Sequence, residues 1–261
     1  MVHDDIDLSA ELTHTIHFDY TQEQLNSCFR ICFELWKQGV ERGTLDRLLE
    51  RIQKVRYLSE EEQLSYKHIR AKLKHLRFAF IVLDKKHKYP WIFHATIALM
   101  GNLQDVLKNK KHNAISRFAF LVRFFTTKPI YALSLRALKQ FTPCTPESFQ
   151  IYVNNEIEFI RKHLSKGAVT SKEFHEMRKV ISRQVALYDN LKTLYPCSYH
   201  RDVSRFLSTI NGLMGNLHDE LITKKLNKAQ DYYLDTFRIP DKIFCRLQVL
   251  VNKYLDKTIY P

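Results

Sequence analysis

The sequence has few of the residues that form tight turns, with six Gly and seven Pro among 261 residues. An all-β protein needs many turns between short strands, so the composition argues against that class. Long hydrophobic runs are also missing, because the longest, such as residues 78–83, are too short to span a bilayer. The first twenty residues contain no Lys or Arg, which argues against a signal peptide and an Arg-rich transit peptide.

Cysteine is scarce and unpatterned. The five cysteines form no Cys-x-x-Cys pair, so neither a zinc site nor a disulfide framework is indicated. Cys28 and Cys32 lie one helical turn apart among aromatic residues, which predicts small buried hydrophobic side chains. We therefore expect a cytoplasmic protein of a reducing compartment, without a metal, a cofactor or a transmembrane segment.

Positive charge is abundant. The chain has 41 Lys and Arg against 28 Asp and Glu, a net charge of +13, beside an ordinary apolar content of 45%. A composition of this kind is typical of a globular protein with a sizeable core. An excess of positive charge favours an anionic partner and says nothing about the fold.

Apolar residues recur with a period of 3.6 nearly throughout, and no alternating strand is convincing. Capping boxes at Ser59-x-x-Glu62 and Thr170-x-x-Glu173 and a first-turn proline, Pro90, mark helix starts. The pattern predicts an all-α fold. The expected helices cover about 21–39, 59–84, 90–110, 114–125, 130–140, 145–167, 170–191 and 199–225, with a last one beginning near 240.

The sequence contains an internal repeat. Residues 99–105 and 213–219 are identical at six of seven positions, at an offset of 114. Residues 66–70 correspond to residues 174–178, and each segment lies after a capping box and one helix before its Gly-Asn motif. A repeat of this length predicts two copies of one helical unit. We expect a single domain over 1–261, built of repeats at 22–145 and 146–261 as two pseudo-symmetric helical bundles around a central basic groove.

The repeated helices carry candidate anion ligands. Cations recur at spacings of three and four on the first helix, and residues 64–83 contain no acid. Like charges at that spacing repel each other, so an anion bound there would stabilise the face. The candidates are Lys67, Arg70, Lys74 and Arg77 in the first copy and His175, Arg178, Lys179 and Arg183 in the second.

The Gly-Asn motifs supply candidate structural residues. Gly101 and Gly215 are expected to let helices pack closely. Asp105 and Asp219 follow four residues later on the same helix faces, where each can hold a neighbouring cation. We expect these residues to support the site rather than to catalyse a reaction.

These motifs resemble the CHAD family, the conserved histidine α-helical domains. Residues 66–77 and 174–183 are similar to the family's two His-x-x-Arg helices, and residues 100–105 and 214–219 to its paired Leu-Gly-x-x-Arg-Asp segments. The resemblance covers the chain from about residue 22 to its end. It implies two similar helical bundles whose basic residues line a central groove that binds inorganic polyphosphate, without catalysis. This sequence has Lys67 in place of the first histidine, and Gln104 or His218 before the motif aspartate.

Three other functions compete with polyphosphate binding. The dyad His218-Asp219, with His175 or His200 as a further ligand, permits a metal-dependent helical phosphohydrolase of the His-Asp type. RNA binding fits the charge and the aromatic content, but the phenylalanines of apolar runs, Phe120 and Phe124 among them, are expected in the core, and no RNA-binding motif is present. Anionic-lipid binding is disfavoured because no helix combines a wide exposed apolar face with a basic one. The sequence leaves the oligomeric state open.

Overall fold

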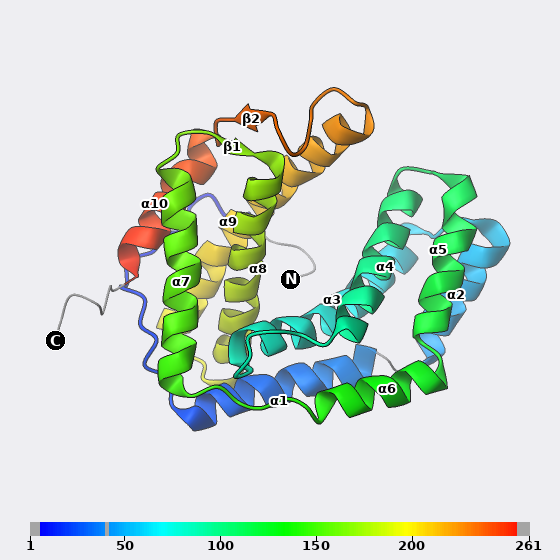
Figure 1. Cartoon of the computed structure of the whole chain (residues 1–261), viewed down its shortest axis with the longest axis horizontal. Coiled ribbons are helices and arrows are strands. Elements are labelled where there is room, and N and C mark those ends of the chain that lie inside the picture. The colour runs from blue at the N-terminus through cyan, green and yellow to red at the C-terminus, as the bar shows by residue number, and fades with distance from the viewer. Residues whose placement is uncertain (1–5, 40–41, 255–261) are drawn as a thin grey trace. The chain divides into compact units, whose positions relative to one another are not determined.

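The computed structural model describes residues 6–39 and 42–254, and these form an all-α fold as predicted (Figure 1). Within this range the chain forms ten helices and one antiparallel pair of two-residue strands. The helices are α1 (Gln22–Gly39), α2 (Arg42–Val55), α3 (Glu60–Leu83), α4 (Trp91–Lys108), α5 (His112–Phe125), α6 (Lys128–Leu138), α7 (Pro146–Leu164), α8 (Ser171–Leu194), α9 (Ser198–Leu226) and α10 (Asp241–Lys253). The strands are β1 (Val169–Thr170) and β2 (Thr236–Phe237). None of the helices in the described ranges is long and apolar enough to cross a membrane.

The chain divides into two compact units. The first unit is residues 22–145 and contains α1–α6, while the second unit joins residues 6–21 to residues 146–254 and contains α7–α10. The second unit is therefore discontinuous in sequence, and each unit has its own core.

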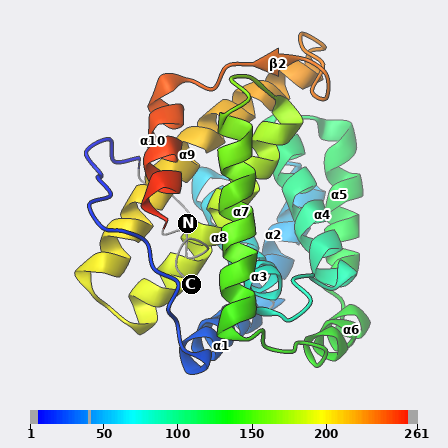
Figure 2. The ribbon, with the colours of Figure 1, turned by 60° about the vertical axis from the view of Figure 1, so that its left-hand side comes forward.

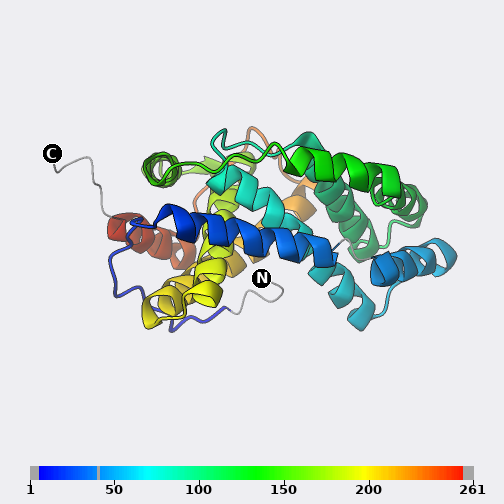
Figure 3. The same ribbon diagram turned by 90° about the horizontal axis from the view of Figure 1, so that it is seen from below.

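In the first unit α1 lies along α3, and α4 and α5 form an antiparallel pair (Figures 1 and 3). Every residue of the last turns of α3, from 78 to 83, is buried. The Trp36 and Phe80 rings both pack on Phe93 of α4, at centroid distances of 6.1 and 5.5 Å. Asp84 ends α3, and its carboxylate accepts the backbone N–H groups of Lys86 and Thr142. These contacts hold the cationic helix α3 in a fixed orientation within the unit.

In the second unit α8 packs along α9, and α7 and α10 lie beside them (Figure 2). Strand β1 directly precedes α8 and pairs with β2, with Val169 opposite Phe237. Thirteen of the 24 residues of α8 are buried. The α8 helix therefore offers less surface to a ligand than a helix at the edge of a bundle.

Residues 6–21 are part of the core of the second unit. Ile16 is fully buried, its N–H donates to the carbonyl oxygen of Lys253 at 2.7 Å, and the Phe18 ring stacks on Tyr254 at 5.0 Å. The Asp7 N–H donates to the hydroxyl oxygen of Thr209 on α9. This acidic segment is therefore held between α9 and α10 along its length.

Local signals in the sequence predict the helix starts well. Both capping boxes form, with the Ser59 and Thr170 side chains accepting the N–H groups of Glu62 and Glu173. Cys28 and Cys32 are buried, as predicted. Helix α2 and the pair of strands have no counterpart among the elements predicted from the sequence.

One prediction about the core is wrong. Phe120 and Phe124 of α5, expected in the core because they lie in an apolar run, are 63% and 51% exposed. The buried residues of α5 are Ile115, Ala119 and Val122, which recur at spacings of four and three. The two phenylalanines lie on the opposite face of that helix.

Candidate functional site

Helix α3 separates an apolar face from a cationic face. Its buried residues include Tyr66, Ile69, Leu73 and Leu76, at the spacing of one helix face. The four predicted ligands of this helix follow the buried residues by one position in the sequence, which places them on a neighbouring face. All four are partly exposed: Lys67, Arg70, Lys74 and Arg77. Beyond its first turn the helix contains no acidic residue, so its own side chains do not neutralise these cations.

Arg70 occupies a space that Gly101 creates. A Cβ added at Gly101 of α4 would lie 2.9 Å from Nη2 and 3.4 Å from Cζ of the Arg70 guanidinium. One turn earlier on α3, the buried Tyr66 hydroxyl donates to the carbonyl oxygen of Met100 at 3.1 Å. Burial raises the pKa of the Tyr66 phenol, so it remains a neutral donor. The Tyr66 hydrogen bond ties α3 to α4 at the point where the guanidinium meets the glycine.

The second unit has the same arrangement. A Cβ added at Gly215 of α9 would lie 3.1 Å from Nη2 and 3.6 Å from Cζ of Arg178 on α8. The atoms that a Cβ at either glycine would meet belong to an arginine side chain, and the predicted role of the glycines in helix packing stays a prediction. Asp105 and Asp219 lie exposed one turn beyond the glycines, and their predicted supporting role stays a prediction.

Arg77 lies among aromatic rings of the first unit. Its guanidinium carbon is 5.4 Å from the Phe78 ring centroid and 5.6 Å from that of Tyr89, and its Nη1 is 3.5 Å from Nδ1 of His94. The Lys74 ammonium lies 5.0 Å from the Phe78 centroid. Cation–π contacts restrict a cation without neutralising its charge. The aromatic rings therefore restrict where the Arg77 and Lys74 side chains lie.

The predicted ligands of α8 are less available. Arg183 forms a buried two-pronged pair with Glu156 of α7, with Nε 3.2 Å from Oε2, and the Tyr152 hydroxyl donates to the same carboxylate at 2.8 Å. Lys179 pairs with Glu176 on its own helix at 2.7 Å, where both side chains are about two-fifths exposed. Arg183 is thus neutralised inside the second unit, which removes it from the set of anion ligands.

Helix α8 also lacks counterparts of the last two cations of α3. Ser182 and Val185 stand at the positions that correspond to Lys74 and Arg77, and both are buried. The Ser182 hydroxyl donates to the side-chain oxygen of Asn211 at 2.7 Å. His175 and Arg178, the other two predicted ligands of α8, are both partly exposed.

The His-Asp dyad lies next to His175. The rings of His175 and His218 are 4.5 Å apart, and His218 Nδ1 is 3.9 Å from Oδ1 of Asp219. His200 is buried, with Nδ1 2.7 Å from the carbonyl oxygen of Tyr195, and does not join them. Among the residues placed by the structure, no three His, Cys, Asp or Glu side chains are grouped as metal ligands.

The first unit accounts for the whole net charge of +13. Residues 22–145 contain 23 Lys and Arg against ten Asp and Glu, which leaves 18 of each (41 − 23 and 28 − 10) for the rest of the chain. The five acids among residues 1–21 offset the excess of cations in residues 146–261, so the chain outside residues 22–145 has no net charge. The sequence alone hides this division, because nothing in it shows that residues 6–21 fold with residues 146–254.

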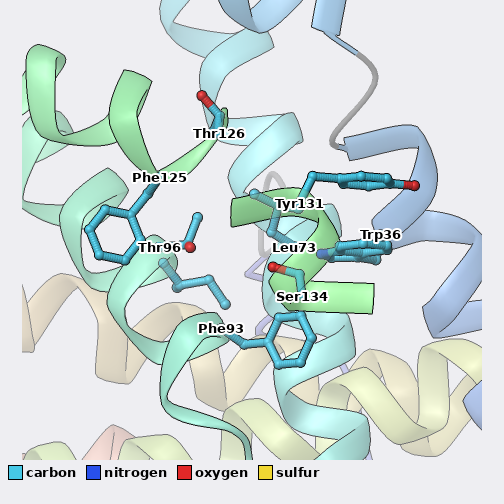
Figure 4. Close-up of a pocket in the computed structure, with 9 residues that line it drawn as sticks. Trp36, Leu73, Phe93, Thr96, Phe125, Thr126, Tyr131 and Ser134 are labelled. Atoms are coloured by element: carbon cyan, nitrogen blue, oxygen red, sulfur yellow. The ribbon is translucent and has the colours of Figure 1, made fainter. Parts of the chain in front are cut away.

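A hollow in the first unit is not an anion site. It lies among the rings of Trp36, Phe93, Phe125 and Tyr131 and has no charged lining residue (Figure 4). The Ser134 hydroxyl, which also lines it, donates to the carbonyl oxygen of Ile130 at 2.9 Å. The hollow is therefore mainly apolar.

No protein-family model, curated protein or solved structure matches the chain.

Proposed function

We propose that the protein binds inorganic polyphosphate, without turning it over, mainly through the cationic face of α3. The observation that carries the proposal is the concentration of charge in the first unit. Residues 63–146 contain sixteen Lys and Arg and only two acids, Asp84 and Asp105. A linear chain of phosphates, with regularly spaced negative charges, is complementary to cations that recur along a helix.

The proposed ligands in the first unit are Lys67, Arg70, Lys74 and Arg77. Support comes from their partial exposure, from the position of the Arg70 guanidinium against Gly101 and from the cation–π contact of Arg77 with Phe78. In an arginine–phosphate contact the guanidinium can donate two parallel hydrogen bonds, whereas a lysine acts as a point charge.

The second unit contributes fewer ligands to the proposed site. His175 and Arg178, which are partly exposed, are kept as proposed phosphate ligands. Lys179 is kept as well, because an exposed ion pair such as Lys179–Glu176 contributes only about 0–1 kcal/mol and a phosphate can replace the carboxylate. Arg183 is omitted because separating a buried pair leaves an uncompensated charge.

We also propose that the two units are copies of one helical unit and that both basic helices serve one polyanion in a basic groove. Support comes from the capping box before each basic helix and from the arginine that meets a glycine in each unit. The resemblance to CHAD domains implies the same arrangement. A polyphosphate long enough to contact both helices would then bind more tightly than a short one, because the second contact is intramolecular.

Binding of three anions at matched ionic strength tests the proposed function. Polyphosphate, a tRNA and orthophosphate are titrated into the purified protein, and release of phosphate from polyphosphate is followed in parallel. We expect polyphosphate to bind more tightly than tRNA, orthophosphate to bind weakly and no phosphate to be released. Tighter binding of tRNA would indicate an RNA-binding protein. Release of phosphate that disappears when His218 and Asp219 are replaced would indicate the phosphohydrolase.

A further inference from the structure

Three bulky aromatic side chains are exposed on α4 and α5 of the first unit. Trp91, in the first turn of α4, and Phe120 on α5 are each 63% exposed, and Phe124 is 51% exposed. The partly buried ring of Phe125 lies between two of them, 6.5 Å from the Trp91 ring and 5.7 Å from the Phe124 ring. Phe120 and Phe124 are one turn apart on the same helix face. Trp91, Phe120 and Phe124 form what we call the aromatic patch.

Phe120 and Phe124 of the aromatic patch lie in a long acid-free part of the sequence. Residues 106–146 contain eight Lys and Arg and no Asp or Glu. Arg117 is three residues before Phe120 on α5, Lys88 is three residues before Trp91, and Lys128 begins α6. All three of these cations are exposed.

A further cation next to Phe124 in the sequence already has contacts with α2. Arg123 of α5 lies 3.7 Å from Glu50 of α2 and also donates to the Gln53 side chain. Arg117, Lys88 and Lys128 are each exposed and three or four residues from a ring of the aromatic patch, so they supply positive charge beside it.

We infer that the aromatic patch docks on the surface of an anionic membrane. Trp and Phe rings enter the boundary between headgroups and acyl chains, and neighbouring Lys and Arg side chains interact with lipid phosphates. The patch supplies the rings, and the cations beside it supply the complementary charge. This inference concerns α4 and α5, and it holds whether or not α3 binds polyphosphate.

The exposed positions of Phe120 and Phe124 reverse the sequence-based argument against lipid binding. Lipid binding was disfavoured because no helix was expected to combine an exposed apolar face with a basic one. Helix α5 has both, since Phe120, Phe124 and Arg117 are all exposed. A site for single-stranded RNA would place its rings along a charged groove that follows the backbone. Here the rings are exposed on two neighbouring antiparallel helices (Figure 1), and they line no hollow identified in this unit. These observations favour the membrane surface.

The two tryptophans make a sensitive test possible. Trp36 is 3% exposed and Trp91 is 63% exposed, so a change in emission on binding reports on Trp91. The full-length protein is mixed with vesicles of phosphatidylcholine alone or with one-third phosphatidylserine, at 150 mM salt. We expect a blue shift, and quenching by lipids brominated near the headgroup, with the phosphatidylserine vesicles only. The W91F variant should lose the shift and still sediment with those vesicles.

Substitution of the rings separates docking from non-specific attraction. The double variant F120S/F124S should lower the vesicle partition coefficient roughly tenfold or more, because both rings stay in water. The matched control I151S/L234S changes two equally exposed apolar residues of the second unit and should leave partitioning unchanged. Circular dichroism checks that the variants are folded, and unchanged polyphosphate binding by F120S/F124S would show that the two proposed sites are separate.

Several results would overturn the inference. The protein would fail to bind anionic vesicles, or would bind both kinds of vesicle equally. The F120S/F124S variant would have the same vesicle partition coefficient as the wild type. A shift of Trp91 emission by single-stranded RNA, with none by vesicles, would reassign the aromatic patch to nucleic acid.

Discussion

Replacing Gly101 with alanine should stabilise the fold and weaken anion binding at the same time. Glycine in a helix interior is about 0.5–1 kcal/mol less favourable than alanine, so the substitution removes that penalty. The new Cβ would meet Nη2 of Arg70 at 2.9 Å, and this atom is the end of a flexible side chain that can move aside. We expect unfolding in urea to show unchanged or higher stability, by up to about 1 kcal/mol.

The guanidinium of Arg70 then no longer occupies the position in which α4 holds it. A charge-assisted contact contributes about 1.5–3 kcal/mol, so partial loss of this contact should weaken polyphosphate binding roughly tenfold. G215A makes the same change at Arg178 in the second unit, which has far less excess positive charge, and should weaken binding less. G43A is the control, because a Cβ there would meet no atom within 4 Å. Wild-type affinity in a stable G101A would refute the role of Arg70, and loss of more than about 1 kcal/mol of stability would show that the glycine is required by the backbone.

Three further predictions concern stability and reactivity. Glu156→Gln should cost about 3–5 kcal/mol, because it leaves the Arg183 charge uncompensated in a buried position; an unchanged melting temperature would contradict this. The hydrogen bond from Lys166, with the backbone bond from Thr170, lowers the pKa of Glu173 from 4.5 to about 2. The stability that Glu173 contributes is therefore complete above about pH 4.5 and lost as the pH falls toward 2, so E173Q should flatten the acid limb of the stability curve. Of the five thiols, two should react with a thiol reagent in the native protein and three only after unfolding; the two are Cys197 and Cys245.

The parts of the fold that local spacing determines could be predicted from the sequence. The capping boxes at Ser59 and Thr170 mark the starts of α3 and α8 because each pairs two residues three positions apart. The same spacing argument places the cations of α3 on a face separate from its buried residues. Helix α2 was missed although Leu45, Leu48 and Ile52 follow the helical period, because no capping box or proline marks its start.

Long-range pairing could not be predicted. Glu156 neutralises Arg183 from a different helix, 27 residues away, and no spacing rule connects the two. The contacts of Ile16 with the end of α10 join positions more than two hundred residues apart, and they decide in which unit the acidic residues 6–21 lie. The exposure of Phe120 depends on which face of α5 meets its neighbours. The first two of these facts shift the candidate anion site toward the first unit.

The salt dependence of polyphosphate binding in a pair of charge-matched variants tests the central claim most directly. K67A/K74A removes two cations from α3, and R238A/K242A removes two exposed cations from the second unit, so both variants have the same net charge. Each phosphate contact that is lost should lower the slope of log affinity against log salt by about 1. The account predicts steep salt dependence for the wild type and for R238A/K242A, and a slope smaller by about 2 with weaker binding for K67A/K74A. Absence of binding at low salt, binding indifferent to salt, or equal effects of the two variants would contradict it.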